Sequence, residues 1–595
     1  MQVLLKNMSN GSNRSSLHEH YEEVEVLEKK GETLGSDAYI KQHELTEEEH
    51  HESIKNANIL TGPQLYLCMF SGLLCLFLVA LDQTITVTIL TTVANKFDAF
   101  SEVTWITTAF VLPLGCLAQF WGKFSVIFGR KFTMLISVFL FEIGSLICAL
   151  ANTMNTLIGG RTLQGIGGGG VISCIFIIVS EITSDDKKPL LLALNGATYG
   201  IASVLGPIVG GLLTKASWRW CFWINLCFAA VVFPCFYFSY NSDWKGDKSF
   251  KNIYSKLKEI DYVGTVTMVA SLVLLLLGIS IGTSYRWGSV ANITCFVLGG
   301  VIFIFFMYWN WFLSKAPVLP PLILKVGKMN INAAISFLAN GLFLSTLQFM
   351  SLYYQIIYDE KPLDSGVSML SNIILTSVGT LVVGYSMNRT RRVKEFVFIS
   401  GVMSALGIGI YQVVKVNSRK ALFIGLQTIC GLGFGFGFHP PLVSAQLVAP
   451  KPSVTDKGMD MKSSVMLSTS YITFSKNIGS AFLSEISQLI YTTTLSKNLR
   501  KVALDENIPN SEILILVKNV DYMSTLIEKH GYEAGISIKK AFLQAIQNVF
   551  WLTFACSLLM TTLGCLMSNK RLPKPQSKEV GKGEKDASLS MTEDT

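Results

Sequence analysis

About fourteen apolar runs recur along the chain, and each is long enough for an α-helix to cross roughly 30 Å of hydrocarbon. They lie near residues 64–90, 103–121, 132–151, 155–180, 189–213, 220–240, 263–283, 291–313, 331–354, 366–388, 395–415, 421–447, 465–490 and 546–567. The composition agrees, because 50% of the residues are hydrophobic and only 15% are charged, as in multi-pass membrane proteins. A bilayer core cannot hydrogen-bond exposed backbone groups, so these runs must fold as helices. The sequence predicts an all-α polytopic membrane protein.

The basic residues predict how the chain is oriented. The formal net charge is +8, and most lysines and arginines fall in alternate loops. The largest groups are Arg130 with Lys131, five lysines between residues 244 and 261, and the segment from Arg389 to Lys394. Cytoplasmic loops of membrane proteins carry such an excess, so we expect an even number of spans with both ends in the cytoplasm. This placement favours the lipid bilayer, and not nucleic acid, as the partner of the positive charge.

The chemistry-bearing residues favour no enzyme class. The twelve cysteines are scattered, mostly within the apolar runs, without the spacing of a metal site or a disulfide framework. No phosphate-binding loop of the type Gly, four residues, Gly-Lys-Ser/Thr occurs in the sequence. We therefore expect no catalytic residues, no metal and no cofactor. If the chain transports solutes, the absence of a nucleotide-binding motif favours a proton gradient as its energy source. A channel and a membrane sensor stay open as alternatives.

One arginine, Arg161, lies inside the apolar run Leu157–Ser180. A guanidinium in a bilayer is costly unless a carboxylate, a backbone carbonyl or water shares its charge. The first apolar run supplies an acid, Asp82, with Gln83 beside it. A buried carboxyl group can load and release a proton as its surroundings open and close. Proton coupling or gating by Asp82 and Arg161 and a purely structural ion pair both stay open, and the two can coexist.

Further polar residues inside the apolar runs are candidates for lining a path along which protons or a solute would cross the membrane. Glu142, in the third run, either faces the pathway or is protonated beside a hydroxyl. The candidates for the substrate cavity are Gln83, Gln164, His439, Asn477 and Glu485. The pair Pro440-Pro441 interrupts the twelfth run, and a broken helix is tolerated at bilayer depth only where protein or a water-filled cavity satisfies its backbone. His439 is either a proton acceptor or substrate contact or a neutral residue near the inner interface, and Glu485 either faces the cavity or lies near the outer edge.

Glycines mark the places where the chain should turn or pack closely. Gly122 and Gly129 lie in the stretch GKFSVIFGRKF, residues 122–132, and allow a tight reversal around Arg130. The fourth run is glycine-rich from Gly165 onward, and Gln164 shares a helical face with Arg161. The hinge candidates of the fifth run, NGATYGIASVLGPIVGGLL, are Gly200, Gly206, Pro207, Gly210 and Gly211. Glycines let helices approach to backbone contact, and proline removes a backbone donor.

These motifs resemble signatures of the major facilitator superfamily. GKFSVIFGRKF resembles its loop after the second span, and LIGGRTLQGIGGGG resembles its fourth-span signature, with Arg161, Gln164 and Gly165 on the key positions. The fifth-run glycines resemble the motif that distinguishes proton-driven exporters from importers. SWRWCFWINL, residues 217–226, and the LDQTI around Asp82 are similar to fourteen-spanner drug:proton antiporters, above all fungal multidrug and vacuolar basic amino acid permeases. One departure is that Val126 and Ile127 stand where the superfamily loop has an aspartate and an arginine.

The resemblance implies a major facilitator fold with two six-helix bundles and two extra central spans. The implied layout is a disordered cytoplasmic N-tail (1–63), an N-terminal bundle (64–240), an inner loop with two linker spans (241–330), a C-terminal bundle (331–567) with an outer loop at 491–545, and a cytoplasmic C-tail (568–595). It also implies a proton-coupled antiporter, and we expect it to work as a monomer. The leading hypothesis is export of drugs or other small lipophilic or cationic solutes across the plasma membrane. The alternative is a vacuolar carrier of basic amino acids, whose cations Asp82, Glu142 and Glu485 would bind.

Overall fold

The computed structural model describes residues 63–182, 188–240, 260–284, 288–314, 317–450, 461–518, 520 and 522–571. The expectations for the N-tail, for residues 241–259 of the inner loop and for the C-tail beyond residue 571 lie outside the described residues. Within the described ranges every regular element is a helix, and eleven helices are long and apolar enough to cross a membrane. Trp105–Cys116 and the segment Thr198–Thr214 are shorter apolar helices. The all-α fold is confirmed, whereas the expected count of fourteen spans is not.

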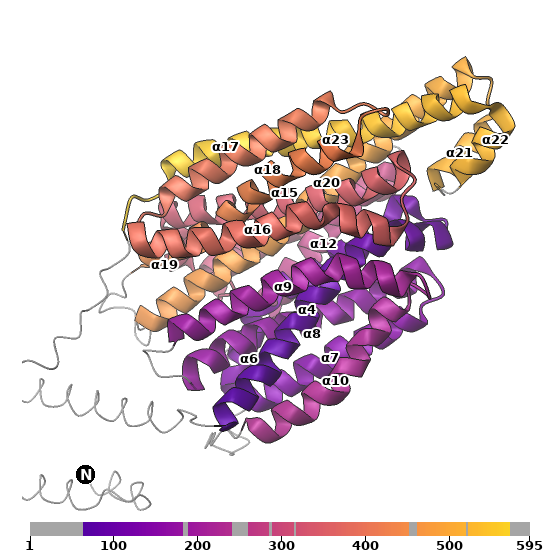
Figure 1. Ribbon diagram of the computed structural model, residues 1–595. Helices are drawn as coiled ribbons and strands as arrows, with labels where there is room; N and C mark the ends of the chain where they lie inside the picture. The colour runs from indigo at the N-terminus through magenta and orange to yellow at the C-terminus, as the bar shows by residue number, and fades with distance from the viewer. Residues whose placement is uncertain are drawn as a thin grey trace, which may run out of the picture. The chain divides into compact units, whose positions relative to one another are not determined.

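The helices between residues 63 and 239 pack together, and we call this group the N-half. Its helices are α4 (Pro63–Lys96), α5 (Trp105–Cys116), α6 (Ala118–Phe128), α7 (Arg130–Leu150), α8 (Met154–Ile182), α9 (Lys188–Thr214) and α10 (Trp220–Ser239). α4 packs against α9 and α10, α7 packs against α8 and α10, and α5 packs against α8. Figure 1 draws these helices in indigo to magenta, running side by side.

The helices between residues 327 and 566 form a second group, the C-half. Its long helices are α15 (Gly327–Ile357), α16 (Pro362–Thr390), α17 (Lys394–Ile410), α18 (Lys420–Gly437), α19 (Pro440–Val448), α20 (Met461–Asp505) and α23 (Tyr532–Leu566). α15 packs against α20 and α23, α17 packs against α18 and α23, and α16 packs against α18. This is the packing order of the N-half repeated, as expected when a bundle is duplicated.

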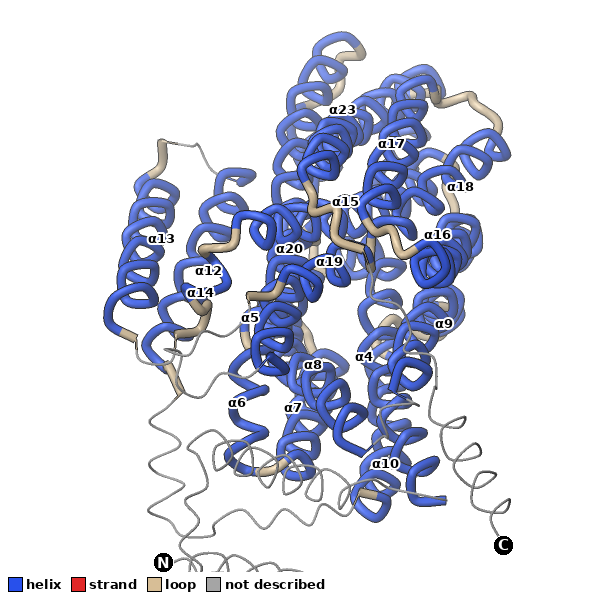
Figure 2. Tube along the Cα trace, turned by 90° about the vertical axis from the view of Figure 1, so that its left-hand side faces the viewer, coloured by secondary structure: helices blue, strands red, loops and turns tan. Residues whose placement is uncertain are grey.

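A helical hairpin connects the two halves in the sequence and packs on one side of them in space. It consists of α12 (Tyr262–Ser284) and α13 (Val290–Tyr308), followed by a π-helical turn (Trp309–Leu313) and the short α14 (Pro321–Leu324). α12 contacts α20 and α5, and Figure 2 shows the hairpin beside these two helices. Asp261 ties its base together, since its carboxylate accepts hydrogen bonds from the Gly264 amide at 2.7 Å and from Trp309 Nε1 at 2.9 Å. The hairpin is therefore an addition to the duplicated halves.

The two halves meet chiefly along two helix pairs, α9 with α16 and α5 with α20. A Cβ atom added at Gly366 of α16 would lie 2.6 Å from the carbonyl oxygen of Pro207, and one added at Gly211 would overlap the backbone of Leu363. Small residues allow helices to approach this closely. Pro207 and Gly211 of the fifth run thus lie where one half touches the other, whereas Gly206 and Gly210 pack against Thr84 and Thr88 of α4 within the N-half.

Three local expectations can be compared with the structure. Gly122 lies inside α6 and not at the reversal, which occurs at Gly129 alone, with a φ of 88° that suits glycine. The interruption of the twelfth run is confirmed, since α18 ends at Gly437 and α19 begins at Pro440. The expected outer loop 491–545 is mostly helical. It comprises the end of α20, α21 (Asn510–Lys518), α22 (Tyr522–His530) and the start of α23.

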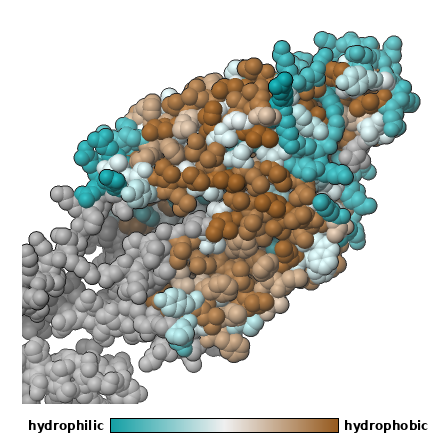
Figure 3. All heavy atoms as spheres, in the orientation of Figure 1, coloured by the Kyte–Doolittle hydropathy of each residue, from teal (hydrophilic) through white to brown (hydrophobic). Residues whose placement is uncertain are grey.

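Apolar side chains cover the middle of the face drawn in Figure 3, between two polar ends. On α16, for example, Leu381 and Tyr385 are exposed. Soluble proteins rarely expose such large apolar patches, so this surface suits contact with lipid. One polar end carries α21 and α22, and we call it the cap end. The other carries the α6–α7 and α16–α17 turns with their arginines and lysines, and we call it the basic end.

Candidate functional site

An ion pair lies fully buried in the middle of the N-half. Asp82 of α4 and Arg161 of α8 both have no exposed surface, and Arg161 Nη1 donates a hydrogen bond to Asp82 Oδ2. The structure thus brings together the acid and the base that the sequence placed in separate apolar runs. In hydrocarbon each charge supplies the compensation that the other needs.

Three neutral side chains complete a network around this pair. Gln164 donates to Asp82 Oδ1 at 3.2 Å and to Ser145 Oγ at 2.7 Å. Asn225 of α10 donates to the same two atoms, at 3.0 Å and 3.2 Å. All three side chains are fully buried. Sequence reasoning missed Asn225 and Ser145, although Asn225 was visible as the one amide in the run SWRWCFWINL.

Arg161 also connects the network to α5. Its Nε donates to the carbonyl oxygen of Ile106 at 3.0 Å, and its guanidinium lies 4.4 Å from the ring centroid of Phe110. Gly165, one turn further along α8, makes this approach possible, because a Cβ there would overlap the carbonyl oxygen of Phe110. A change at the ion pair is therefore felt by α5, which is one of the helices that touch the other half.

Glu142 lies apart from this network. The residue is half-buried on α7, and its two carboxyl oxygens are buried with no hydrogen-bond partner. Such a carboxyl group is much more stable there with a proton than as an unpaired anion. It fits a proton-binding site but not the hydroxyl-paired arrangement that the sequence left open.

The candidates for the substrate cavity separate into two groups. Gln83 is half-buried and accepts a hydrogen bond from Tyr199 of α9, and His439 is half-buried at the break between α18 and α19. By contrast, Gln164 belongs to the buried network described above. Asn477 and Glu485 are also buried, 6% and 1% exposed, on the side of α20 that faces α5: Asn477 packs on Gly115, and Glu485 faces Thr104 and Thr108.

Lys476 of α20 lies between the two halves and was missed by sequence reasoning. Its Nζ is 5.9 Å from the ring centroid of Tyr199 in the N-half and 5.4 Å from that of Phe438 in the C-half. His439, next to Phe438, is close enough to Lys476 to feel its charge. The signal was present, because a lysine inside the thirteenth apolar run is as unusual as Arg161 in the fourth.

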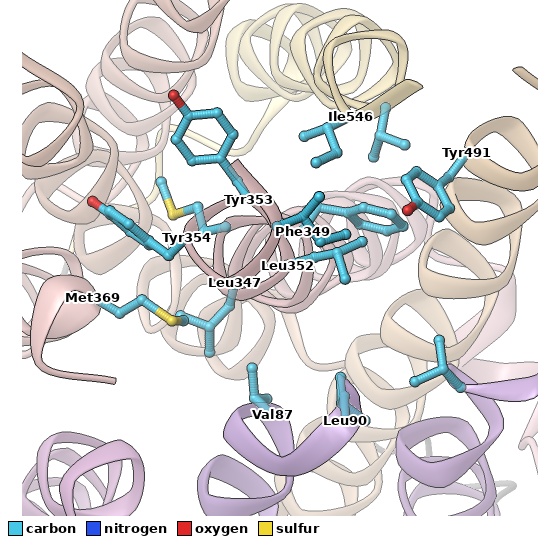
Figure 4. Close-up of a cluster of buried hydrophobic side chains, with 14 of the residues drawn as sticks. Val87, Leu90, Leu347, Phe349, Leu352, Tyr353, Tyr354, Met369, Tyr491 and Ile546 are labelled. Atoms are coloured by element: carbon cyan, nitrogen blue, oxygen red, sulfur yellow. The ribbon is translucent and has the colours of Figure 1, made fainter. Parts of the chain in front are cut away.

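The halves are tied together toward the cap end. Ser351 donates to the Val87 carbonyl at 3.4 Å, Gln488 donates to the Phe100 carbonyl at 3.1 Å, and the side chains of Thr91 and Gln355 are hydrogen-bonded. Figure 4 shows Val87 and Leu90 of α4 facing the apolar side chains of α15 in the same region. Polar ties and an apolar seal together close the space between the halves at this end.

At the opposite end, Arg130 holds the α6–α7 turn. Its Nη1 donates to the carbonyl oxygen of Ser125 at 2.6 Å. Among the described residues no group of three or more His, Cys, Asp or Glu side chains could hold a metal ion.

Comparison with known sequences places this geometry in a family. The sequence profile of the Major Facilitator Superfamily matches residues 72–482. The chain is 30% identical to azole resistance protein 1 of Saccharomyces cerevisiae, over 85% of this chain and 89% of that protein. It is 28% identical to the probable efflux pump gsfJ of Penicillium aethiopicum, over 86% and 89% of the two chains. It is also 28% identical to vacuolar basic amino acid transporter 5 of Saccharomyces cerevisiae, over 87% and 93%.

A solved structure shows the same fold. A bacterial homologue of the human lysosomal transporter Spinster, in an inward-facing and occupied conformation, matches with a TM-score of 0.56 at 10% identity, over 87% of this chain and all of that one. The family is one of transporters, so the chain is a membrane transporter for small solutes and not an enzyme. The chain belongs to the major facilitator superfamily, and within it to the fungal drug-efflux family.

Proposed function

We propose that the protein is a proton-coupled antiporter that exports small lipophilic solutes by alternating access. The observation that carries this proposal is the buried network of Asp82, Arg161, Gln164 and Asn225. It holds an ionisable acid without solvent contact, and through the Ile106 carbonyl it touches a helix that packs on the other half. A proton that arrives at Asp82 weakens its hold on Arg161 and thereby alters how α5 is held.

The magnitudes support this coupling. Removing one partner of a buried ion pair costs about 3–5 kcal/mol, because the other charge is left uncompensated. One pH unit supplies about 1.4 kcal/mol per proton, and 100 mV of membrane potential adds about 2.3 kcal/mol. A single proton moving down an ordinary gradient therefore carries energy comparable with that needed to disrupt the pair. Glu142, whose carboxyl oxygens have no partner, is the second proton-binding candidate.

The conformation supports the alternating-access part of the proposal. The ties between Ser351 and Val87, and between Gln488 and Phe100, keep the cap end closed. With the basic end in the cytoplasm, this is a state closed toward the outside. We propose fourteen spans, with the α12–α13 hairpin as the extra pair, and a working monomer. Export favours the plasma membrane as the location, and a fluorescent tag on the C-terminus would test it.

Transport by proteoliposomes would test the proposal. The vesicles would hold the pH dye pyranine in an acidic lumen, and uptake of a labelled neutral azole would be measured beside lumenal pH. The wild-type chain is expected to take up the azole while the lumen loses protons. Asp82→Asn should lose both activities by about 100-fold, the scale of a lost ionic contact of a few kcal/mol. Asp359→Asn, at an exposed ion pair, is the matched control and should keep them.

The outcomes decide between the parts of the proposal. Wild-type vesicles that take up no azole and release no protons would overturn proton-coupled export. Wild-type activity in Asp82→Asn would remove that residue from the coupling mechanism.

A second candidate function is proton-coupled transport of basic amino acids into the vacuole. The similarity to a vacuolar basic amino acid transporter over 87% of this chain favours it. Uptake of labelled lysine, arginine and histidine into vacuoles isolated from cells with and without the gene would test it. Loss of this uptake together with unchanged drug sensitivity would put the second candidate before the first.

A further inference from the structure

Lys476 places a positive charge between the two halves. It is half-buried on α20, and its neighbours are the ring faces of Tyr199 from α9 and of Phe438 from the end of α18. Helices of both halves therefore contribute to its surroundings. A charge at this place faces whatever solute lies between the halves during transport.

No carboxylate among the described residues forms an ion pair with Lys476. The acid of the N-half, Asp82, is already paired with Arg161. Glu485 lies nine residues further along α20, which at about 100° per residue puts it on the opposite side of the helix, facing Thr104 and Thr108. The histidine nearby, His439, offers no negative charge in either protonation state.

The groups around this lysine are aromatic or neutral. Phe343 of α15 packs edge-on against Phe438, with ring centroids 5.1 Å apart, and Tyr199 donates its hydroxyl hydrogen to Gln83. An aromatic ring face attracts a cation much less strongly than a carboxylate or another anion does. They leave the ammonium donors of Lys476 available to an acceptor on a bound solute, and they offer ring surfaces to an apolar body.

We propose that the solute is a lipophilic aromatic anion, such as a carboxylate or phenolate, and that Lys476 selects its charge. This rests on the proposed export function and narrows its substrate class. A cationic solute would lie beside an uncompensated like charge, which disfavours both cationic drugs and basic amino acids. Export of an anion also moves negative charge out of a cell whose interior is negative, so the membrane potential assists it.

Two xanthene dyes of similar size and opposite charge would test the charge selection. Fluorescein is anionic and rhodamine 123 is cationic at pH 7.4. Both would be offered to proteoliposomes holding the full chain under the same pH gradient. The wild type is expected to carry fluorescein with a kcat/KM about tenfold or more above that for rhodamine 123, the scale of one charged hydrogen bond.

Variants of the lysine would assign the effect to this residue. Lys476→Gln should lower fluorescein transport by about tenfold, Lys476→Arg should keep most of it, and Lys476→Glu should reverse the preference toward rhodamine 123. Lys497→Gln removes an exposed lysine from the same helix and should change nothing. Thermal unfolding in detergent would show that each variant is folded, and fluorescein binding measured by anisotropy would follow the same order as transport.

Different results would overturn the charge selection and the export function. A wild type that prefers rhodamine 123, or a Lys476→Gln variant that keeps full fluorescein transport and binding, would overturn the charge selection while export stands. Should Lys476→Gln be unfolded, loss of the preference in the folded Lys476→Glu protein decides for the proposal and its persistence decides against it. A wild type that carries neither dye and no neutral azole would instead overturn the export function.

Discussion

The N-half and the C-half share one packing order but hold their buried polar groups differently. In the N-half, the described residues include a fully buried ion pair, Asp82 with Arg161, inside a network of amides. In the C-half, many buried contacts across helices join neutral groups, such as Ser345 with Ser487 at 2.6 Å, and each described ion pair includes a partly exposed side chain. Duplicating a helical bundle thus preserves its packing without preserving its chemistry.

The difference matters because the two kinds of contact have different energies. A neutral hydrogen bond contributes about 1 kcal/mol net, whereas breaking a buried ion pair costs about 3–5 kcal/mol. The N-half therefore depends on one contact in a way that the C-half does not. A proton can switch an ionic contact but has no comparable effect on a pair of serine hydroxyls. Under the proposed proton coupling, the buried ion pair of the N-half is the contact that a proton would switch.

The largest effect is expected from Arg161→Met. The change leaves Asp82 buried without its counter-charge and should lower the free energy of unfolding by about 3–5 kcal/mol. Thermal unfolding in detergent would measure it. The double variant Asp82→Asn, Arg161→Met removes both charges and should regain most of the stability but no proton-coupled transport. A single variant as stable as the wild type would contradict the energetic role of the pair.

A smaller effect is expected from the corresponding change in the C-half, Gln427→Met. Gln427 is fully buried on α18, which packs in the C-half as α8 packs in the N-half. Its side-chain amide donates to Ser371 Oγ at 2.6 Å. Because methionine has a similar volume, the free energy of unfolding should fall only by the contribution of the lost neutral hydrogen bonds, about 1 kcal/mol. The same unfolding measurement applies. A loss as large as that of Arg161→Met would mean that the halves do not differ as described.

The smallest effect is expected at a partly exposed ion-pair cluster near the cap end, in which Glu512 contacts Lys529 and His530. Hydrogen bonds from Lys529 and His530 lower the pKa of Glu512 below its ordinary value. Its contribution is therefore present above the unfolded pKa and is lost as the pH falls through the lower folded pKa. Glu512→Gln should slightly increase hydrogen exchange in α21 and α22 at pH 7. The difference from the wild type should vanish in acid, and transport should not change.

Sequence reasoning predicted the ion pair because an arginine in hydrocarbon demands a partner. It missed Asn225 and Ser145 because neutral polar residues in apolar runs are common and require no particular contact. It assigned Gln164 to the cavity, and it could not tell which way the side chains of Asn477 and Glu485 face. That direction depends on the rotation of each helix about its axis, which is set by packing and not by hydropathy.

The helices of the fold could be predicted from the sequence, but some of their ends and turns could not. Runs of apolar length predicted helices because the bilayer permits little else. The polar and amphipathic stretch after residue 490 predicts an outer loop with some helix, whereas α20 continues to Asp505 and its leucines at residues 495 and 499 are buried. Gly129 and Gly122 looked equivalent in sequence, and only the backbone geometry shows that one is a turn and the other lies within a helix.

The length of α20 has a consequence for how opening would be observed. Its 45 residues extend about 68 Å at 1.5 Å per residue, more than twice the thickness of the hydrocarbon layer. The helix is therefore longer than the lipid layer is thick, and the α21–α22 segment follows it at the cap end, where the Val520 amide donates a hydrogen bond to the Asn95 side chain of the N-half at 3.1 Å. Opening of the cap end, as the proposed alternating access requires, would separate this segment from α4 while it stays attached to α20, so a pair of spin labels across that contact would report each transport cycle from outside the lipid.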